Sequence, residues 1–262
     1  MQFAQVAVPE QPPEKCPICE DERQYVGQDG QQWTTLRELA QSHSNRIVQQ
    51  EDYLYGIGTE PKFAIGQRAL LIQSDEGNVL WDCISLIDEQ TIEAVKARGG
   101  ISAIAISHPH YYASAVEWAM AFGVKVYLHE ADRQWVMRPD PRIEFWQGDT
   151  LSLQAGITLL KTGGHFAGGT VCHWEWGTGG SGTLLTSDII QVVADKRWVS
   201  FMYSYPNLIP LSAAKVRHIA SVVEPYSFDR IYGAWWDAIV ATEAKAVVQR
   251  SVNRYIKAIE GS

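Results

Sequence analysis

Apolar positions along the chain gather in short runs, and one of these runs ends at a pair of histidines. Ala103–Ser107 is a run of small and β-branched residues, which is typical of a strand buried on both faces. It leads into His108, Pro109 and His110. Because alternate residues leaving a strand point to the same side, the two imidazoles are expected to reach toward one point. Pro109 favours an extended backbone at His108 and disfavours a helix starting there.

The other apolar runs predict strands and helices in both halves of the chain. Two runs flank Ser74–Asn78, whose composition is that of a hairpin turn. We expect further strands at 125–129, 150–153, 157–161, 170–176, 183–186 and within 226–236, and helices at 88–98, 114–122, 131–137, 212–224 and 242–259. Strand-rich stretches with interspersed helices predict an α+β fold in which two sheets pack together with helices outside.

The amino-terminal residues differ from the rest in composition. Residues 1–32 are rich in Gln, Pro, Gly and charged side chains, and they predict an extended arm. Thr35 and Glu38 have the spacing of a capping box, which predicts a short helix directly after Thr35. We therefore expect an amino-terminal arm with a short helix over residues 1–45 and one main domain over residues 46–262.

The arm contains a Cys-x-x-Cys motif, Cys16–Cys19, which resembles one half of a zinc ribbon. A structural zinc site needs four ligands, yet no second such pair occurs and Cys83 and Cys172 are isolated. A structural pair of reduced thiols is the favoured interpretation, and a metal site completed by His43 or by a second subunit is the alternative. This motif is the one hint of a homo-oligomer.

Composition and charge narrow the classes of partner. The chain has 262 residues, of which 46% are hydrophobic and 20% charged, as in a soluble globular protein with a sizeable core. A net charge of −8 and no cluster of Lys and Arg argue against nucleic acid. No apolar run approaches the length of a membrane span, and the first residues lack the features of a secretory signal. We expect a cytoplasmic protein with reduced cysteines, no membrane partner and a small-molecule substrate.

A third histidine and a carboxylate complete a candidate metal site. The loop Thr162–Gly169 places glycines on both sides of His165, and glycine allows turns that are closed to other residues. Asp188 ends another strand-like run. Three neutral imidazoles and a carboxylate are a familiar ligand set for zinc, whereas two imidazoles and a carboxylate also hold ferrous iron. We expect His108, His110, His165 and Asp188 to bind one divalent metal, zinc first and iron as the alternative.

The order of these motifs resembles that of the metallo-β-lactamase superfamily. A hairpin ending in Trp81-Asp82 precedes Ser107–His110, Gly164–Gly168 and Thr186–Asp188. The corresponding family motifs are His-x-His-x-Asp-His, a Gly-His-Thr-Pro-Gly loop and a Thr-Gly-Asp strand end, and the match spans roughly residues 60 to 260. The resemblance implies a four-layer αββα sandwich with its metal site at one edge of the paired sheets.

At the metal-ligand positions, the departures from the family pattern are confined to the second of its two metals. Tyr112 and Ala113 stand where the family has Asp and His, and Ala234 stands where it has a late histidine. In the family these three residues bind the second metal. The three retained histidines correspond to the ligands of the first metal, and Asp188 corresponds to the bridging residue. The resemblance therefore implies a degenerate second metal site and a mononuclear centre.

A lone metal in this setting would activate a water molecule and polarise a carbonyl oxygen. The leading hypothesis is a mononuclear metal-dependent hydrolase acting on a small ester, thioester or lactone-type substrate. A non-catalytic binding protein and a mononuclear iron oxygenase, as in the sulfur dioxygenases of the superfamily, are the alternatives. Asp188 and Tyr112 are the candidate catalytic residues, with Asp237 a candidate to replace the missing carboxylate; packing and surface roles are the alternative for Tyr112 and Asp237. The remaining histidines are expected to be structural, although His129 could support the site: His43, His129, His173 and His218.

Overall fold

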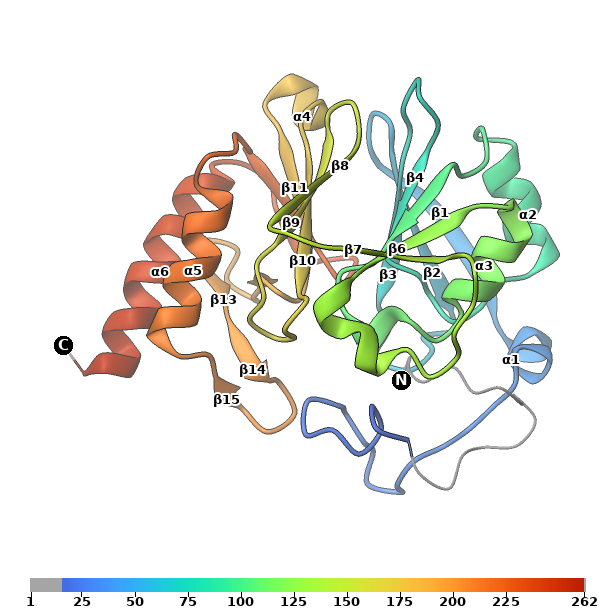
Figure 1. The fold of residues 1–262 in the computed structure, drawn as a ribbon, viewed down its shortest axis with the longest axis horizontal. Coiled ribbons are helices and arrows are strands. Elements are labelled where there is room, and N and C mark those ends of the chain that lie inside the picture. The colour runs from blue at the N-terminus through green and yellow to red at the C-terminus, as the bar shows by residue number, and fades with distance from the viewer. Residues whose placement is uncertain (1–15, 262) are drawn as a thin grey trace. The chain divides into compact units, whose positions relative to one another are not determined.

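The computed structural model describes residues 16–261, which form two compact units that divide after Trp146. Each unit is built around one large β-sheet (Figure 1). No helix among residues 16–261 is long and apolar enough to cross a bilayer. The predicted division into an arm over 1–45 and a main domain over 46–262 stays a prediction.

The first unit is a mixed seven-stranded sheet with strand order β1-β2-β3-β4-β5-β6-β7. Strands β1 to β4 pair in antiparallel fashion, whereas β4 to β7 pair in parallel. The elements of this unit are α1 (Leu36–Ser42), β1 (Ser44–Glu51), β2 (Leu54–Glu60), β3 (Arg68–Ile72), β4 (Val79–Trp81), α2 (Glu89–Lys96), β5 (Ala103–Ala105), the 3-10 helix η1 (Pro109–Tyr111), α3 (Ala115–Phe122), β6 (Lys125–His129), the 3-10 helix η2 (Glu130–Trp135) and β7 (Ile143–Trp146).

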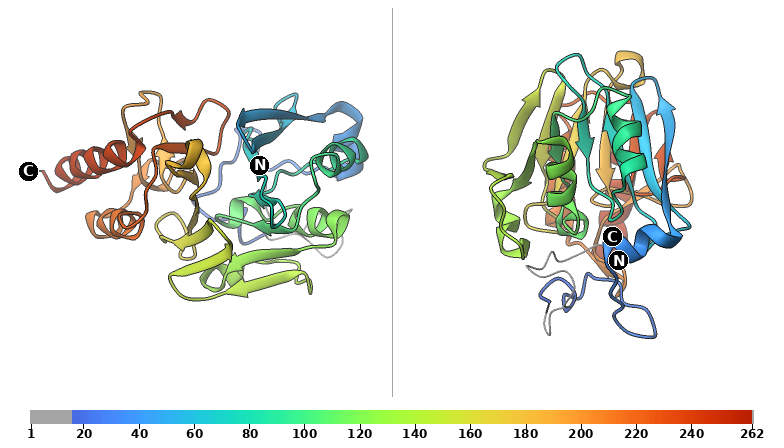
Figure 2. Two further views of the ribbon diagram at one scale, coloured as in Figure 1. Left: turned by 90° about the horizontal axis from the view of Figure 1, so that it is seen from above. Right: turned by 90° about the vertical axis from the view of Figure 1, so that its right-hand side faces the viewer.

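Helices α2 and α3 lie side by side over this sheet (Figure 2). Nearby residues determine where each helix begins or ends. Helix α2 begins at Asp88, whose carboxylate accepts the Thr91 N–H at 2.7 Å. Helix α3 ends at Gly123, whose φ of 70° is the left-handed conformation that glycine adopts without strain. Trp118 of α3 is fully buried, and its indole N–H donates to the Ile84 carbonyl at 2.9 Å. The helices therefore cover the parallel strands, including β5, which precedes the first two histidines in the chain.

Most elements predicted for this unit are confirmed. The hairpin is β3 and β4, and the helices predicted at 88–98 and 114–122 are α2 and α3. The capping box at Thr35 is present, with the Glu38 N–H donating to the Thr35 hydroxyl oxygen at 3.2 Å. One expectation is wrong, because a helix does start at Pro109: η1 begins there, with proline in the first turn, where no amide hydrogen is needed.

The second unit is a six-stranded sheet with strand order β17-β16-β11-β10-β9-β8. Within it, β11 and β16 are parallel neighbours. The elements of this unit are β8 (Thr150–Gln154), β9 (Ile157–Lys161), β10 (Thr170–Trp174), α4 (Gly177–Gly180), β11 (Thr183–Ser187), β12 (Gln191–Val192), β13 (Val199–Ser200), β14 (Met202–Ser204), β15 (Ile209–Pro210), α5 (Ala213–Val223), β16 (Arg230–Gly233), β17 (Ile239–Val240) and α6 (Ala244–Glu260).

Helices α5 and α6 lie side by side (Figure 1) and supply one side of the core of the second unit. Val216 and Ile219 of α5 and Val248 of α6 are buried in one apolar cluster with Leu184 and Ile231 from the central strands. The two helices predicted at 212–224 and 242–259 are thus confirmed. Burial of these aliphatic side chains removes apolar area from water, which is the main favourable term in folding.

Part of the amino-terminal arm is packed rather than extended. Cys16 and Ile18 are buried against Trp135 and Met137, so the expectation of an unpacked arm is wrong for this stretch. The expectation of reduced thiols is also wrong for this pair, because Cys16 and Cys19 form a disulfide. A tight turn, closed by the Glu20 N–H donating to the Cys16 carbonyl at 3.0 Å, brings the two side chains together. Residues 1–15 of the predicted arm lie outside the described residues.

Gly182 and Gly180 provide a matched test of packing in the second unit. Both have positive φ, 83° and 91°, but a side chain at Gly182 would collide with the Ser227 carbonyl, whereas nothing lies within 4 Å at Gly180. We predict that Gly180→Ala costs about 1–2 kcal/mol of unfolding free energy from backbone strain. Gly182→Ala should cost about 1–3 kcal/mol more, because rigid backbone must move. Urea denaturation of both variants checks this, and equal midpoints would contradict it.

Candidate metal centre

The first histidine is positioned by two parallel strands that end side by side. Trp81 of β4 and Ala105 of β5 are paired, and the Asp82 N–H donates to the Ala105 carbonyl at 2.8 Å. Asp82 has φ of 62°, a left-handed conformation that is unfavourable for a residue with a side chain. This conformation ends β4 and turns the Asp82 carboxylate toward Ser107, the residue before His108. The carboxyl ends of parallel strands are a common location for functional residues.

A buried hydrogen-bond chain fixes the proton on His108. Asp82 accepts both the Ser107 N–H and the Ser107 hydroxyl at 2.8 Å. The Ser107 hydroxyl oxygen lies 2.8 Å from Nδ1 of His108. Because the hydroxyl hydrogen is directed to the carboxylate, its oxygen acts as acceptor and Nδ1 carries the hydrogen. The lone pair of His108 is therefore on Nε2, the arrangement in which outer partners orient a metal-binding histidine.

His110 lies on the short helix η1, and its approach to His108 has a different cause from the one expected. His108 is extended, with φ of −170°, but strand β5 has ended at Ala105 and His110 lies in the 3-10 turn. The two imidazole rings are nevertheless 5.0 Å apart between centroids, at an interplanar angle of 77°. The prediction that both rings reach toward one point is correct, but a tight turn produces it rather than strand alternation.

The third histidine is held in a glycine loop of the second unit. The amides of Thr162 and Gly163 both donate to the Gly169 carbonyl at 2.8 Å, which closes the loop. Gly163 and Gly164 have φ of 65° and 88°, so the expectation that these glycines permit special turns is correct. Nδ1 of His165 lies 2.8 Å from the carbonyl oxygen of Tyr203. Since a carbonyl only accepts, Nδ1 is the donor and Nε2 carries the lone pair.

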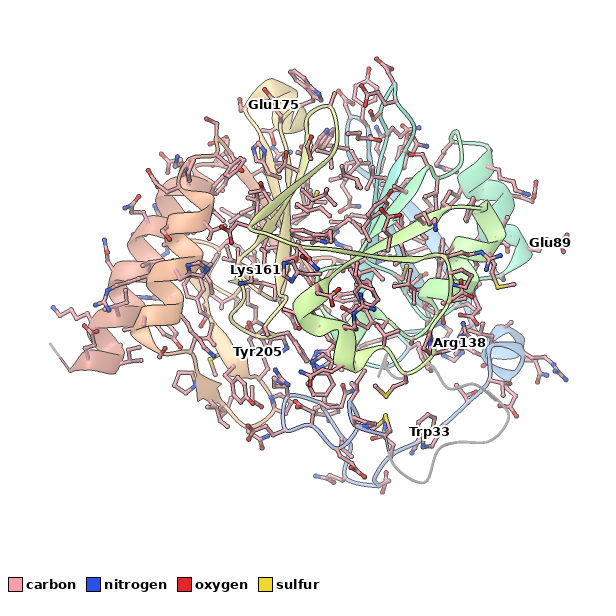
Figure 3. All side chains as sticks on the ribbon, in the orientation of Figure 1. Trp33, Glu89, Arg138, Lys161, Glu175 and Tyr205 are labelled. Atoms are coloured by element: carbon pink, nitrogen blue, oxygen red, sulfur yellow. A yellow bond between two sulfur atoms is a disulfide. The ribbon has the colours of Figure 1, made fainter. Side chains whose placement is uncertain are left out.

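Asp188 comes directly after strand β11 in the same unit and is buried, with 4% of its surface exposed. The preceding residue, Ser187, has φ of 52°, so this strand also ends in a left-handed residue. The hydroxyl of Tyr205, labelled in Figure 3, donates to the backbone carbonyl of Asp188 at 2.5 Å. Burial raises the pKa of the Asp188 carboxyl, although His165 nearby opposes this. A neighbouring cation would favour its ionised form.

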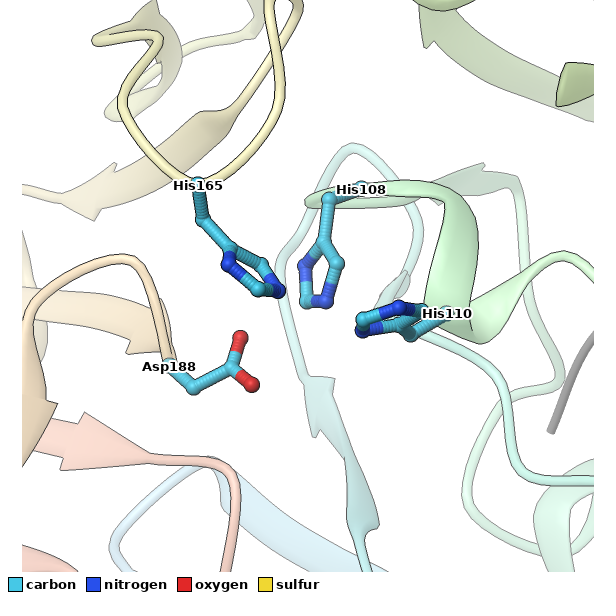
Figure 4. Close-up of side chains that lie close together, drawn as sticks. All are labelled: His108, His110, His165 and Asp188. Atoms are coloured by element: carbon cyan, nitrogen blue, oxygen red, sulfur yellow. The ribbon is translucent and has the colours of Figure 1, made fainter. Parts of the chain in front are cut away.

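The four predicted ligands form one group. His108, His110, His165 and Asp188 are all buried, and each offers one ligand atom within 4.8 Å of those of the other three (Figure 4). Among the described residues 16–261, one group of His, Cys, Asp or Glu side chains has the geometry to hold a metal ion, and it is this group. Three imidazoles and a carboxylate match the donor set of protein zinc sites. The group could therefore bind a metal.

Residues at the predicted second-metal positions lie elsewhere or lack donors. Tyr112 is 3% exposed within the apolar core of the first unit, and burial, followed by the charges of Asp132 and Asp82, raises the pKa of its phenol well above 10. Ala234 comes directly after β16, and its N–H donates to the Ser187 carbonyl at 3.1 Å. Asp237 is exposed and is not in the ligand group. The catalytic role of Tyr112 stays a prediction.

The remaining histidines make structural contacts. Nδ1 of His129 accepts the Ala131 N–H at 3.2 Å, which caps η2, and its ring contacts Trp146. His173 lies in β10, with Nε2 at 2.8 Å from the Ser227 carbonyl. His43 contacts Ser42 and Phe63, and His218 is exposed on α5.

The outer partners of the ligands are not among the residues predicted from the sequence. Ser107 and Asp82 belong to the motifs only as neighbours of other residues, and neither the Tyr203 carbonyl nor the Tyr205 hydroxyl is part of a motif. A serine next to a predicted histidine ligand was the available signal for the first pair. A backbone carbonyl, as at Tyr203, has no signature in the sequence.

Two arginines of α6 lie over the ring of Trp198 in the second unit. The Arg254 guanidinium lies 3.7 Å from the Trp198 ring centroid and that of Arg250 lies 5.9 Å away. The Arg250 side chain also donates to the Arg197 carbonyl at 3.0 Å. Asp195 forms an ion pair with Arg197 at 2.7 Å beside them, and the expectation of no nucleic-acid partner stays a prediction.

Comparison with solved structures identifies the class of fold. The structure of DIM-1 metallo-β-lactamase matches with a TM-score of 0.63 and 12% identity over 82% of this chain and 98% of that chain. The mono-zinc form of the metallo-β-lactamase FIM-1 from Pseudomonas aeruginosa matches with a TM-score of 0.59 and 12% identity over 80% and 95%. The protein therefore has the metallo-β-lactamase fold, and the predicted α+β fold class is confirmed.

The chain belongs to the same protein family as the uncharacterized protein YmaE of Bacillus subtilis (strain 168). The two sequences are 54% identical over 250 residues, which is 95% of this chain and 91% of that protein. No protein-family model matches the sequence.

The proton positions at His108 and His165 can be tested by nitrogen-15 NMR of chelator-treated protein. We predict the Nδ1-protonated tautomer at both residues, because Ser107 and the Tyr203 carbonyl accept from Nδ1. Ser107→Ala should remove this preference at His108 and leave His165 unchanged, which serves as the internal control. An Nε2-protonated tautomer at either residue in the unaltered chain would contradict the assignment.

Proposed function

We propose that this protein is a mononuclear metal-dependent hydrolase that acts on a small ester, thioester or lactone-type substrate. The observation that carries the proposal is the group of four buried donors, His108, His110, His165 and Asp188, with ligand atoms within 4.8 Å of one another. The metallo-β-lactamase fold of the chain supports a metal-dependent hydrolase as well. Because one fold can host many functions, the proposal rests on the four donors and not on the fold.

The residues of the group fit a divalent cation. His108 and His165 hold their hydrogens on Nδ1, which leaves the lone pair of each Nε2 for a ligand bond. A buried carboxylate is costly when ionised, as the raised pKa of Asp188 indicates, and a divalent ion would offset that cost. Zinc suits three imidazoles and a carboxylate best, and iron is the alternative metal.

The side chains at the second-metal positions favour one metal rather than two. Ala113 and Ala234 have no donor atoms, and the Tyr112 phenol stays protonated because burial raises its pKa. None of the three is a good ligand for a second ion. The mono-zinc form of FIM-1 is a structure of this fold with a single zinc, which supports the feasibility of such a centre.

Asp188, Tyr205 and Tyr112 have different roles in the proposed reaction. When bound, a metal would supply Lewis acidity and lower the pKa of a water molecule toward neutrality. Asp188 offers a carboxylate that accepts a hydrogen bond from the attacking water and orients it, while Tyr205 fixes the backbone of Asp188. Burial raises the pKa of the Tyr112 phenol and keeps it protonated near neutral pH, so the role left for it in this proposal is to donate a hydrogen bond or a proton rather than to act as a base.

Metal content tests the ligand assignment. We predict about one zinc per chain in protein purified without added metal, because three imidazoles and a carboxylate complete a zinc site. His165→Ala should lose most of it, whereas His218→Ala, which alters an exposed histidine on α5, should retain it. Elemental analysis by mass spectrometry measures both. No metal in the unaltered chain would refute the proposal, and iron with oxygen uptake would favour an oxygenase.

Activity tests the role of Asp188. We predict that zinc-loaded protein hydrolyses at least one member of a panel of nitrophenyl esters, thioesters and lactones. Asp188→Asn should lower kcat/KM by about 10²–10⁴-fold, since it removes a ligand charge and a proton acceptor together. Asp237→Asn, a change at an exposed carboxylate, should leave kcat/KM within about twofold, the scale of an ordinary surface substitution. Equal loss in both variants, or no loss in either, would contradict the role.

A further inference from the structure

The Cys-x-x-Cys motif is not used by the proposed hydrolase. Cys16 and Cys19 form a disulfide in a tight turn of the first unit. Within residues 16–261, no third His, Cys, Asp or Glu joins this pair to complete a metal-binding group. The zinc-ribbon alternative therefore lacks ligands in the part of the chain that the structure describes. The pair needs a different explanation.

This disulfide does little to join distant parts of the chain. Its two cysteines are separated by three positions, so it closes a very small ring and removes little chain entropy from the unfolded state. The turn is held independently of it, because Ile18 is completely buried against Trp135 and Met137. The backbone bond from the Glu20 N–H to the Cys16 carbonyl also spans the turn. Reduction of the disulfide is therefore compatible with the folded chain.

The two sulfurs have different surroundings. Cys16 is 4% exposed, whereas Cys19 is half-buried and faces solvent in part. The backbone N–H of Cys19 donates to Sγ of Cys16 at 3.3 Å. A hydrogen bond to sulfur favours its thiolate form, so Cys16 is suited to be the leaving sulfur and Cys19 the sulfur that is attacked.

We propose that Cys16 and Cys19 form a redox-active site that exchanges with dithiols. In the first step, the thiolate of an incoming dithiol bonds to Sγ of Cys19 as the Cys16–Cys19 bond breaks. The electron pair passes to Sγ of Cys16, where the Cys19 N–H stabilises it. The second thiol of the reagent then attacks its own sulfur in the mixed disulfide and releases Cys19. The dithiol leaves as a disulfide, and its two hydrogens end on Cys16 and Cys19.

Reversible reduction of the full chain by dithiothreitol is the first test. We expect two additional thiols per chain under native conditions, detected by alkylation and mass spectrometry, and their loss again in oxidised dithiothreitol. The urea midpoint should be nearly unchanged on reduction. Cys83 and Cys172 are internal controls, because both are buried and should remain unalkylated in either state. Reduction only after unfolding, or a large fall in the midpoint, would overturn the proposal.

Single variants test which sulfur is attacked. Cys16→Ser, which leaves Cys19, should react with an aromatic disulfide probe at least about tenfold faster than Cys19→Ser, since access controls thiol reactivity. The double variant, with both residues changed to Ser, gives the background from the two buried thiols. Equal rates, or faster reaction of Cys19→Ser, would overturn the assignment.

Zinc analysis of the double variant separates this proposal from the proposed hydrolase. The double variant should contain as much zinc as the unaltered chain, because the His and Asp ligands are untouched. A loss of zinc confined to the double variant would show that the cysteines hold a metal, and would overturn the redox site while leaving the metal centre in place.

Discussion

The candidate metal centre depends most on the pair of hydrogen bonds that the buried carboxylate of Asp82 accepts from Ser107. The carboxylate accepts the N–H and the hydroxyl of Ser107, both at 2.8 Å, and so fixes the residue that precedes His108. Those two bonds connect the residue after β4 to the segment that follows β5, and they determine which nitrogen of His108 carries the hydrogen. Without them, a buried carboxylate and a buried imidazole would each lose a hydrogen-bond partner, which is expensive in a low-dielectric interior. The contact between Asp82 and Ser107 thus orients the His108 ring and also leaves the lone pair of its Nε2 available to a metal.

In the second unit, Asp188 also follows a strand end with left-handed backbone, but other groups hold it in place. Ser187 adopts a left-handed backbone before Asp188, as Asp82 does at the end of β4, with φ of 52° and 62°. Each such residue costs on the order of 1–3 kcal/mol and persists only where its surroundings fix it. The fixing groups at Asp188 are the Tyr205 hydroxyl and the parallel strand β16, whose next residue donates to the Ser187 carbonyl. Two of the left-handed non-glycine residues of the described chain, Asp82 and Ser187, therefore lie at strand ends that lead to metal-ligand candidates.

The four residues that form the candidate metal-binding group were predicted from the sequence, but the groups that hold them in place were not. Strand ends and a glycine loop pointed to His108, His110, His165 and Asp188, and the resemblance to the metallo-β-lactamase superfamily joined them into one set. The short helix η1 was not predicted, since proline was considered as a barrier and not as a first-turn residue. The Tyr203 carbonyl could not be predicted, because every residue has one and only the fold brings it to His165. The Cys16–Cys19 disulfide was not predicted, because the expected cytoplasmic location favours reduced thiols. Whether two cysteines can bond depends on the local geometry of the turn, which the sequence does not specify.

The central claim is that one metal is bound by imidazole and carboxylate groups alone. X-ray absorption spectroscopy of the zinc-loaded protein tests it most directly, because it reports the atoms around the metal. We predict a first shell of nitrogen and oxygen at about 2.0–2.2 Å, with no sulfur. There should be no metal–metal distance near 3.5–4 Å, the approximate spacing of two-metal sites. Sulfur at about 2.3 Å, or a metal–metal distance in that range, would contradict the mononuclear His and Asp centre.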